Sequence, residues 1–167
     1  VEKCWLMPEQ LNALLQYFRD YAAENNFDAW NPVKHEGMMR QLLIRWSVSE
    51  QKALVALLTG KSEGLDFESL ADDLMKRLPF VKGFIWGLNA QRSDVARAED
   101  IIATRGDLTL KEKLKDKEFR ISLASFFQTN TRGAEILYQK TNDFLSLTGT
   151  ETLLDAYCGT GSIGLFC

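Results

Sequence analysis

Cysteine, histidine and long apolar runs are scarce in this sequence, and each scarcity excludes a class of protein. The 167 residues contain three cysteines, at positions 4, 158 and 167. They lie too far apart for a CxxC site and do not suggest a secreted disulfide framework. No apolar run approaches the roughly 20 residues that cross a bilayer, and the first residues lack the charged-then-apolar pattern of a signal peptide. The sequence therefore predicts a cytoplasmic protein in a reducing setting, without a membrane partner.

An excess of positive charge is also missing. The formal net charge is −3, so no overall positive field points to a nucleic-acid partner, although a local basic face is compatible with it. Hydrophobic residues make up 46% and charged residues 26%, which is typical of a soluble globular domain. Val1 is not an initiator methionine, and Cys167 falls where a helix should just be starting. We therefore expect both ends to be cuts through a longer polypeptide.

Hydrophobic periodicity predicts helices and strands that do not alternate strictly. Helices are expected from Pro8 to about Asn26, from Phe67 to Leu78 behind an Asp66 N-cap, and from Thr131 to Leu147 before Gly149. Strands are expected at 38–46 and 52–59 as a hairpin, and at 81–88, 118–123 and 152–157. The polar stretch 89–117 is expected to be a solvated face, in which "DLTLKEKL" could form a short strand. The order favours an α+β domain over residues 1–124, followed in 125–167 by the truncated start of an α/β, Rossmann-like domain.

The segment "LLDAYCGTGSIG" contains a glycine loop directly after the last expected strand. Gly159, Gly161 and Gly164 fit G-x-G-x-x-G, a spacing that lets the backbone approach a ligand closely. Asp155 lies four residues before the first glycine. A dinucleotide-binding fold places its acid roughly 20 residues after the loop, on the ribose. An acid before the loop instead resembles the first motif of S-adenosylmethionine-dependent methyltransferases, in which the carboxylate helps to organise the amino-acid end of the cofactor. The alternative is a tight strand-to-helix turn without a ligand.

A second segment, "FRISLASFFQTNTRGAEILY", narrows the class. Together with the glycine loop it closely resembles the RNA uracil-5-methyltransferase family, which makes 5-methyluridine in transfer and ribosomal RNA. Phe126, Gln128 and Asn130 match the family's F-x-Q-x-N segment, which lies over the cofactor cleft. Earlier segments such as "GMMRQLLIRWS" resemble the family's central domain more loosely. The resemblance thus covers the whole chain, and its specific motifs lie in the last third.

The resemblance also implies site residues. The residues expected at the S-adenosylmethionine site are Gln128, Asp155, Tyr157, Gly159, Gly161 and Ser162. Phe126 and Gln128 are expected at the target base, where the Phe126 ring would stack on a base flipped out of the RNA. Because neighbouring side chains of an extended segment point to opposite sides, we expect one of Phe126 and Phe127 to be a core residue instead.

The family's chemistry needs residues beyond the glycine loop. A cysteine thiolate adds to carbon 6 of uracil, carbon 5 takes the methyl group, and a base then removes the carbon 5 proton. In the family the nucleophile and the base lie downstream of the loop, so the 167 residues are expected to hold no catalytic residue and to be inactive alone. Cys158 has no base near it in the sequence, and Cys167 comes too early to match the nucleophile. Residues after about 150 are expected to be displaced, paired with another chain or poorly ordered, since a lone parallel strand has no sheet to join.

Cys4 matches the last of four cysteines that hold an iron–sulfur cluster in a subset of this family. Thiolates are the usual ligands of a 4Fe–4S cluster, but a single cysteine cannot hold one. Cys4 is therefore expected to be a free thiol in this chain, and cluster ligation in a longer protein stays open.

Two other functions are compatible with the residues. A non-catalytic RNA-binding or interaction module would use Arg40, Arg45, Trp46 and Lys52, against the plainer interpretation of a buried tryptophan and solvated charges. A methyltransferase acting on a small molecule or a protein is a third possibility, and the resemblance to the family's central domain argues against it.

Overall fold

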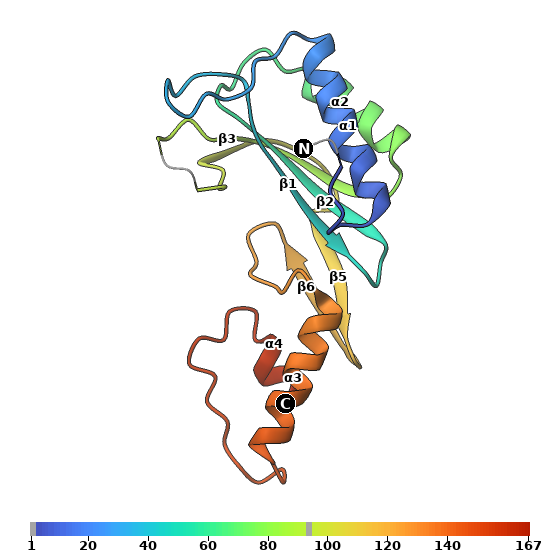
Figure 1. The fold of residues 1–167 in the computed structure, drawn as a ribbon, viewed down its shortest axis with the longest axis vertical. Helices are drawn as coiled ribbons and strands as arrows, with labels where there is room; N and C mark the ends of the chain where they lie inside the picture. The colour runs from blue at the N-terminus through green and yellow to red at the C-terminus, as the bar shows by residue number, and fades with distance from the viewer. Residues whose placement is uncertain (1–2, 93–94) are drawn as a thin grey trace.

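The structure is a computed structural model that describes residues 3–92 and 95–167, arranged in two lobes (Figure 1). The first lobe contains a four-stranded sheet with α1 (Glu9–Glu24) and α2 (Phe67–Arg77) packed on one face. The second lobe contains a two-stranded hairpin, β5 (Thr109–Leu114) and β6 (Lys117–Ser122), with α3 (Thr131–Leu145) and α4 (Ser162–Phe166). This mixed α/β content agrees with the expected class, while the boundary between 124 and 125 stays a prediction.

The sheet of the first lobe has the order β1-β2-β3-β4. Its strands are β1 (Met39–Ser47), β2 (Lys52–Thr59), β3 (Val81–Leu88) and β4 (Asp100–Gly106). β1 and β2 form the expected antiparallel hairpin, and β3 has the expected bounds. β2 and β3 are parallel because α2 carries the chain back across the sheet, and β4 pairs antiparallel at the edge. The mostly exposed side chains of β4 agree with the solvated face expected over 89–117, but the strand itself was not predicted, because these residues show little hydrophobic alternation.

Local signals in the sequence account for several of these elements. The Asp66 carboxylate accepts a hydrogen bond from the Ser69 backbone N–H at 3.2 Å, which confirms the N-cap of α2. β5 alternates between buried and exposed side chains, with Leu110 and Leu114 buried. Leu110 packs on the face of the sheet opposite α1 and α2, whereas Leu114 packs with α3. The hairpin therefore connects the cores of the two lobes.

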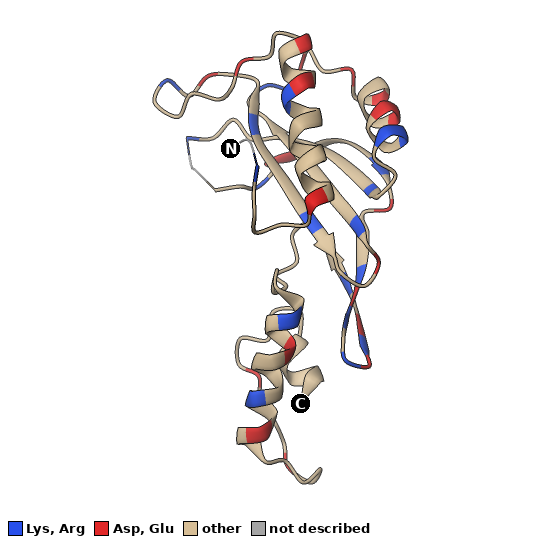
Figure 2. Cartoon of the chain, turned by 45° about the vertical axis from the view of Figure 1, so that its right-hand side comes forward, with Lys and Arg blue, Asp and Glu red and all other residues tan. Residues whose placement is uncertain are grey.

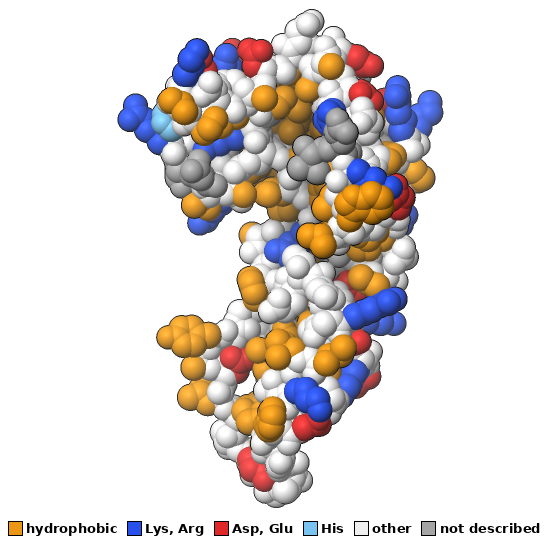
Figure 3. Space-filling view, viewed as in Figure 1, with side chains coloured by type: hydrophobic (Ala, Val, Ile, Leu, Met, Phe, Trp, Pro, Cys, Tyr) orange, Lys and Arg blue, Asp and Glu red, His pale blue; other side chains and the backbone are white. Residues whose placement is uncertain are grey.

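The chain after α3 departs from the expected secondary structure. α3 ends at Leu145, because Ser146 adopts a left-handed conformation (φ 49°) there, so the expected stop at Gly149 is wrong. No strand forms over 152–157: Leu154 is 84% exposed, and within the described ranges no strand pairs with this segment. The expected strand is wrong as an element, and the expected displacement of the segment from any sheet is confirmed. Figure 3 shows apolar side chains projecting from this part of the second lobe.

Across the described residues, no helix combines the length and the apolar character that a bilayer crossing requires.

Candidate functional site

The segment that links β6 to α3, residues 123–131, is called the strap here. Its two phenylalanines point in different directions: Phe127 is buried at 6% exposure beside Phe119, and Phe126 is 71% exposed. This confirms that one of the pair is a core residue and identifies it as Phe127. Gln128 is exposed, as Phe126 is. The strap therefore holds one aromatic ring in the core and presents another, together with an amide, at the surface.

The structure brings the strap and the glycine loop together. The Thr160 hydroxyl, between the first two loop glycines, donates a hydrogen bond to the Phe126 carbonyl oxygen at 3.1 Å, although 34 positions separate these residues. The two segments that carry the resemblance are therefore neighbours in space as well as matching motifs in sequence.

A groove of about 950 Å³ lies along the strap. Phe126 and Gln128 line it from the strap, Arg45 and Trp46 line it from β1, and Leu6 lies on the N-terminal segment at its edge. Among the described residues that line this groove, two are arginines and none is an aspartate or a glutamate. The groove is thus largely apolar with a positive bias, which suits a flat aromatic ligand that carries phosphate.

The glycine loop places an unsatisfied carboxylate oxygen next to a glycine. Asp155 Oδ2 is buried and has no hydrogen-bond partner among the described residues. A Cβ atom on Gly164 would lie 3.6 Å from this oxygen, so the backbone of the loop packs directly against Asp155. Gly159 and Gly161 have φ values of 53° and 72°, in the left-handed region that favours glycine. A buried acceptor without a partner is costly, and a hydrogen-bond donor from a ligand would satisfy it.

The remaining predicted site residues lie in different surroundings. Tyr157 is 99% exposed and extends into solvent. Ser162 is buried at the start of α4, and its hydroxyl shares a hydrogen bond with the Tyr138 hydroxyl at 3.1 Å. Asn130 caps α3, because its side-chain oxygen accepts from the Gly133 N–H at 2.9 Å. The structure thus places Asn130 in a helix cap and leaves Phe126 and Gln128 to face the groove.

The basic residues considered for an RNA-binding module already have partners within the chain. Arg40 donates from Nη1 to the carbonyl oxygens of Asn89 and Gln91, both at 2.7 Å. Lys52 donates from Nζ to the Pro79 carbonyl oxygen at 2.8 Å. In the view of Figure 2, Lys and Arg are interspersed with Asp and Glu on the helices of both lobes. These contacts favour structural roles for the two side chains.

Arg45 and Trp46, the other two residues of that set, lie side by side on β1 with different contacts. The Trp46 ring packs edge-on against Phe80, with centroids 6.2 Å apart. Arg45 donates from Nε to the Leu123 carbonyl oxygen at 3.1 Å, and burial lowers the pKa of its guanidinium. Arg45 therefore holds the start of the strap.

Glu112 is a buried charged residue that sequence reasoning missed. It is 1% exposed, and its carboxylate accepts hydrogen bonds from the backbone N–H groups of Val48 and Ser49 and from the Thr131 hydroxyl. The signal that could have identified it is its position on β5 between Leu110 and Leu114, where the alternation calls for an inward-facing apolar side chain.

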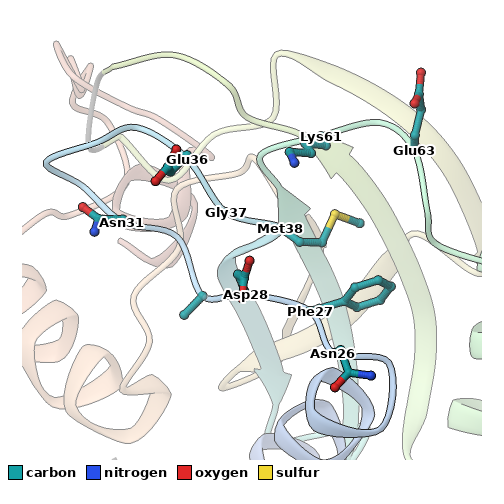
Figure 4. A pocket seen from close by; sticks show the side chains of 10 residues that line it. Asn26, Phe27, Asp28, Asn31, Glu36, Gly37, Met38, Lys61 and Glu63 are labelled. Carbon is teal, nitrogen blue, oxygen red and sulfur yellow. The ribbon is translucent and has the colours of Figure 1, made fainter.

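A second cavity, of about 680 Å³, lies at the far end of the first lobe (Figure 4). The loop between α1 and β1 contributes Asp28 and Glu36, and the segment after β2 contributes Lys61 and Glu63. Charges of both signs line this cavity, and no residue of the strap or the glycine loop reaches it.

Several known proteins similar to this chain are named RNA methyltransferases. No protein-family model matches the chain. A curated protein of Clostridium acetobutylicum, named as an uncharacterized RNA methyltransferase, is 32% identical over 165 residues, which are 98% of this chain and 36% of that protein. A protein of the same description from Chlorobaculum tepidum is 33% identical over 99% of this chain and 35% of its own length. The chain is homologous to RNA methyltransferases.

A solved structure extends this relationship to the fold. The crystal structure of Pyrococcus abyssi tRNA (uracil-54, C5)-methyltransferase in complex with S-adenosyl-L-homocysteine matches with a TM-score of 0.80 and 25% identity. The match covers 99% of this chain and 39% of that one. The chain therefore spans little more than a third of the length of its RNA methyltransferase relatives.

The residues present fit a methyl donor of the kind that these relatives' names imply. S-Adenosylmethionine carries an ammonium group, and Asp155 Oδ2 is a buried acceptor that lacks a donor. Cys4 offers much less for a metal cluster. It is a free thiol whose backbone N–H donates to Asn12 Oδ1 at 2.8 Å, and the described residues contain no group of three or more His, Cys, Asp or Glu side chains that could hold a metal ion.

Proposed function

We propose that this chain belongs to a longer RNA methyltransferase that transfers a methyl group from S-adenosylmethionine to carbon 5 of a uridine in ribosomal or transfer RNA. The observation that carries the proposal is the hydrogen bond between Thr160 and the Phe126 carbonyl, which joins the strap to the glycine loop beside an aromatic-lined groove. The RNA methyltransferase relatives support the reaction class, and the solved tRNA methyltransferase supports carbon 5 of uracil. We further propose that these 167 residues are inactive alone and that the longer protein works in the cytoplasm.

The cofactor would be held by Asp155, the loop glycines Gly159 and Gly161, and Gln128. The cofactor supplies an electrophilic methyl group on a sulfonium centre. The role of this chain is to bind and orient it, with the Asp155 carboxylate accepting from its ammonium group. Tyr157 and Ser162 belong to the proposed site as well. Tyr157 has its whole ring available, whereas Ser162 must share its hydroxyl with Tyr138.

The target base would stack on Phe126. A ring that is 71% exposed beside a 950 Å³ groove offers the flat apolar face that an extruded base requires. Stacking on an aromatic side chain contributes about 1–3 kcal/mol per base. Gln128, two residues further along the strap, would donate or accept a hydrogen bond at the edge of the base. Cys4 would ligate a 4Fe–4S cluster only if the longer protein supplies three further thiolates.

Replacing Gln128 tests this function. In the longest natural polypeptide that contains this chain, Gln128→Ala should lower the rate of methyl transfer to RNA about 100-fold, because a misplaced base or cofactor loses near-attack geometry. The measurement is the yield of labelled 5-methyluridine in digested RNA after incubation with methyl-labelled S-adenosylmethionine. Gln10→Ala, at an exposed glutamine on α1 that does not line the groove, is the matched control and should leave the rate unchanged. A Gln128→Ala protein that works normally would show that the site is assigned wrongly.

A non-catalytic RNA-binding module is the alternative function. Tight, salt-sensitive binding of RNA to these 167 residues alone would favour it, because neutralised phosphates give binding a steep dependence on salt. The internal partners of Arg40 and Lys52 lead us to expect weak binding in such a titration.

A further inference from the structure

The start of the strap is held by a two-pronged contact from β1. Arg45 donates from Nε to the Leu123 carbonyl oxygen at 3.1 Å and from Nη2 to the Ser125 carbonyl oxygen. Backbone carbonyls of an irregular, partly buried segment need such partners, and the planar guanidinium offers donors in a fixed geometry. Because guanidinium remains protonated throughout the physiological range, this contact is not lost although burial lowers the Arg45 pKa. The conformation of residues 123–125 is therefore tied to β1.

The end of the strap is held by a buried carboxylate. Glu112 Oε2 accepts from the Val48 N–H at 2.7 Å and from the Thr131 hydroxyl at 3.3 Å. Its other oxygen, Oε1, accepts from the Ser49 N–H and the Lys113 N–H, both at 3.0 Å. One side chain of β5 thus joins the turn between β1 and β2 to the first residue of α3.

The functional side chains between these two anchors have little packing of their own. Phe126 and Gln128 are exposed, and Phe127 and the Thr160 hydroxyl hold only the centre of the segment. The direction in which Phe126 and Gln128 face the groove is then set by where the ends of the strap are fixed.

We infer that Arg45 and Glu112 are positioning residues, which clamp the two ends of the strap to the sheet of the first lobe and so fix Phe126 and Gln128 over the groove. Both anchors lead to the same hairpin, because Arg45 lies on β1 and Glu112 bonds the turn between β1 and β2. A shift of that hairpin would be transmitted to both ends of the strap. The anchoring is a claim about this chain, and only its consequence for methyl transfer rests on the proposed function.

Glu112→Gln is the most informative substitution. It preserves volume but replaces one acceptor oxygen with an N–H₂ group, which then faces the donors that the carboxylate satisfied. Glu118→Gln is the matched control, since Glu118 lies on β6 opposite Lys113 and its side chain is exposed. Arg45→Lys tests the other anchor, because a lysine carries a point charge that cannot reproduce the two-pronged contact.

Hydrogen exchange followed by mass spectrometry measures the anchoring directly in the 167-residue chain. We expect amides of residues 124–131 to exchange at least about tenfold faster in Glu112→Gln and in Arg45→Lys, with peptides from α1, β2 and β3 unchanged and Glu118→Gln like the parent. Unchanged exchange in the strap would overturn the inference. Uniformly faster exchange throughout the chain would overturn it too, because it would show that the two residues only support global stability.

Methyl transfer separates this inference from the proposed function. In the longer polypeptide, Glu112→Gln should lower kcat about tenfold or more, with little change in the KM for S-adenosylmethionine, because the cofactor loop itself is intact. A strap that loosens while methylation continues at the normal rate would leave the anchoring established and would refute the role proposed for Phe126 and Gln128.

Discussion

At the scale of single residues, two carboxylates of this chain behave in opposite ways. Glu112 is almost fully buried, and four donors saturate it, so it acts as a structural acceptor. Asp155 has one buried oxygen with no partner among the described residues. A folded protein rarely leaves such an atom unsatisfied without a reason. The contrast is consistent with the roles proposed for these residues, Glu112 in the framework of the strap and Asp155 as a partner of the ligand.

Glu151 gives a residue-scale prediction that can be checked by titration. Its side chain accepts hydrogen bonds from the Thr148 hydroxyl and from the backbone N–H groups of Thr148, Gly149 and Thr150. These bonds, led by the Thr148 hydroxyl, lower the pKa of Glu151 from its ordinary 4.5 to about 2. NMR titration of the side-chain carboxyl carbon should find a midpoint near 2, and Thr148→Ala should raise it. A midpoint of about 4.5 in the parent chain would contradict the turn.

The sign of the pH effect follows from the depressed value. Because the carboxylate is favoured in the folded turn, its stabilisation is complete above the unfolded pKa of 4.5 and is lost as the pH falls towards 2. The turn between α3 and the glycine loop should therefore open between about pH 4.5 and pH 2 and stay intact at neutral pH.

At the scale of elements, apolar patterns that repeat over a few residues were sufficient to predict most helices and strands. The apolar periodicity of α1 and α2 and the alternation of β6 predicted those elements, since each buries one continuous face. β4 was not predicted because most side chains of this edge strand are exposed, so its sequence lacks the alternation of apolar and polar residues that indicates a strand. The strand expected at 152–157 did not form for the opposite reason: its apolar pattern is present, but no strand in the described part of the chain accepts its backbone hydrogen bonds.

The Asp66 cap provides an element-scale prediction. Asp66→Ala should lower the free energy of unfolding by about 1 kcal/mol, because the Ser69 N–H at the start of α2 loses its acceptor. Asp66→Asn keeps a side-chain oxygen and should cost much less. Urea denaturation of the three proteins, compared at constant m-value, measures the difference. An equal loss in both variants would show that charge, and not the hydrogen bond, makes the cap effective.

At the scale of the whole molecule, the site depends on contacts between segments that are distant in sequence. The motifs predicted that Phe126, Gln128 and Asp155 belong to one site, and the Thr160 contact places the two segments that carry them, the strap and the glycine loop, side by side. The anchoring roles of Arg45 and Glu112 could not be predicted, because their contacts span 80 and 19 positions and neither residue belongs to a motif. Local patterns thus indicate the residues proposed to contact a ligand, whereas the residues that hold them are found only from long-range packing.

The central claim is that the loop from Asp155 to Gly164 holds a sulfonium methyl donor and not a nicotinamide dinucleotide. Titration calorimetry on the longest natural polypeptide that contains this chain tests it, with S-adenosylhomocysteine and NAD as the two probes. We predict saturable binding of S-adenosylhomocysteine, weakened about tenfold or more by Asp155→Asn and unchanged by Asp143→Asn at an exposed aspartate of α3, with no binding of NAD. Binding of NAD without binding of S-adenosylhomocysteine would contradict the account.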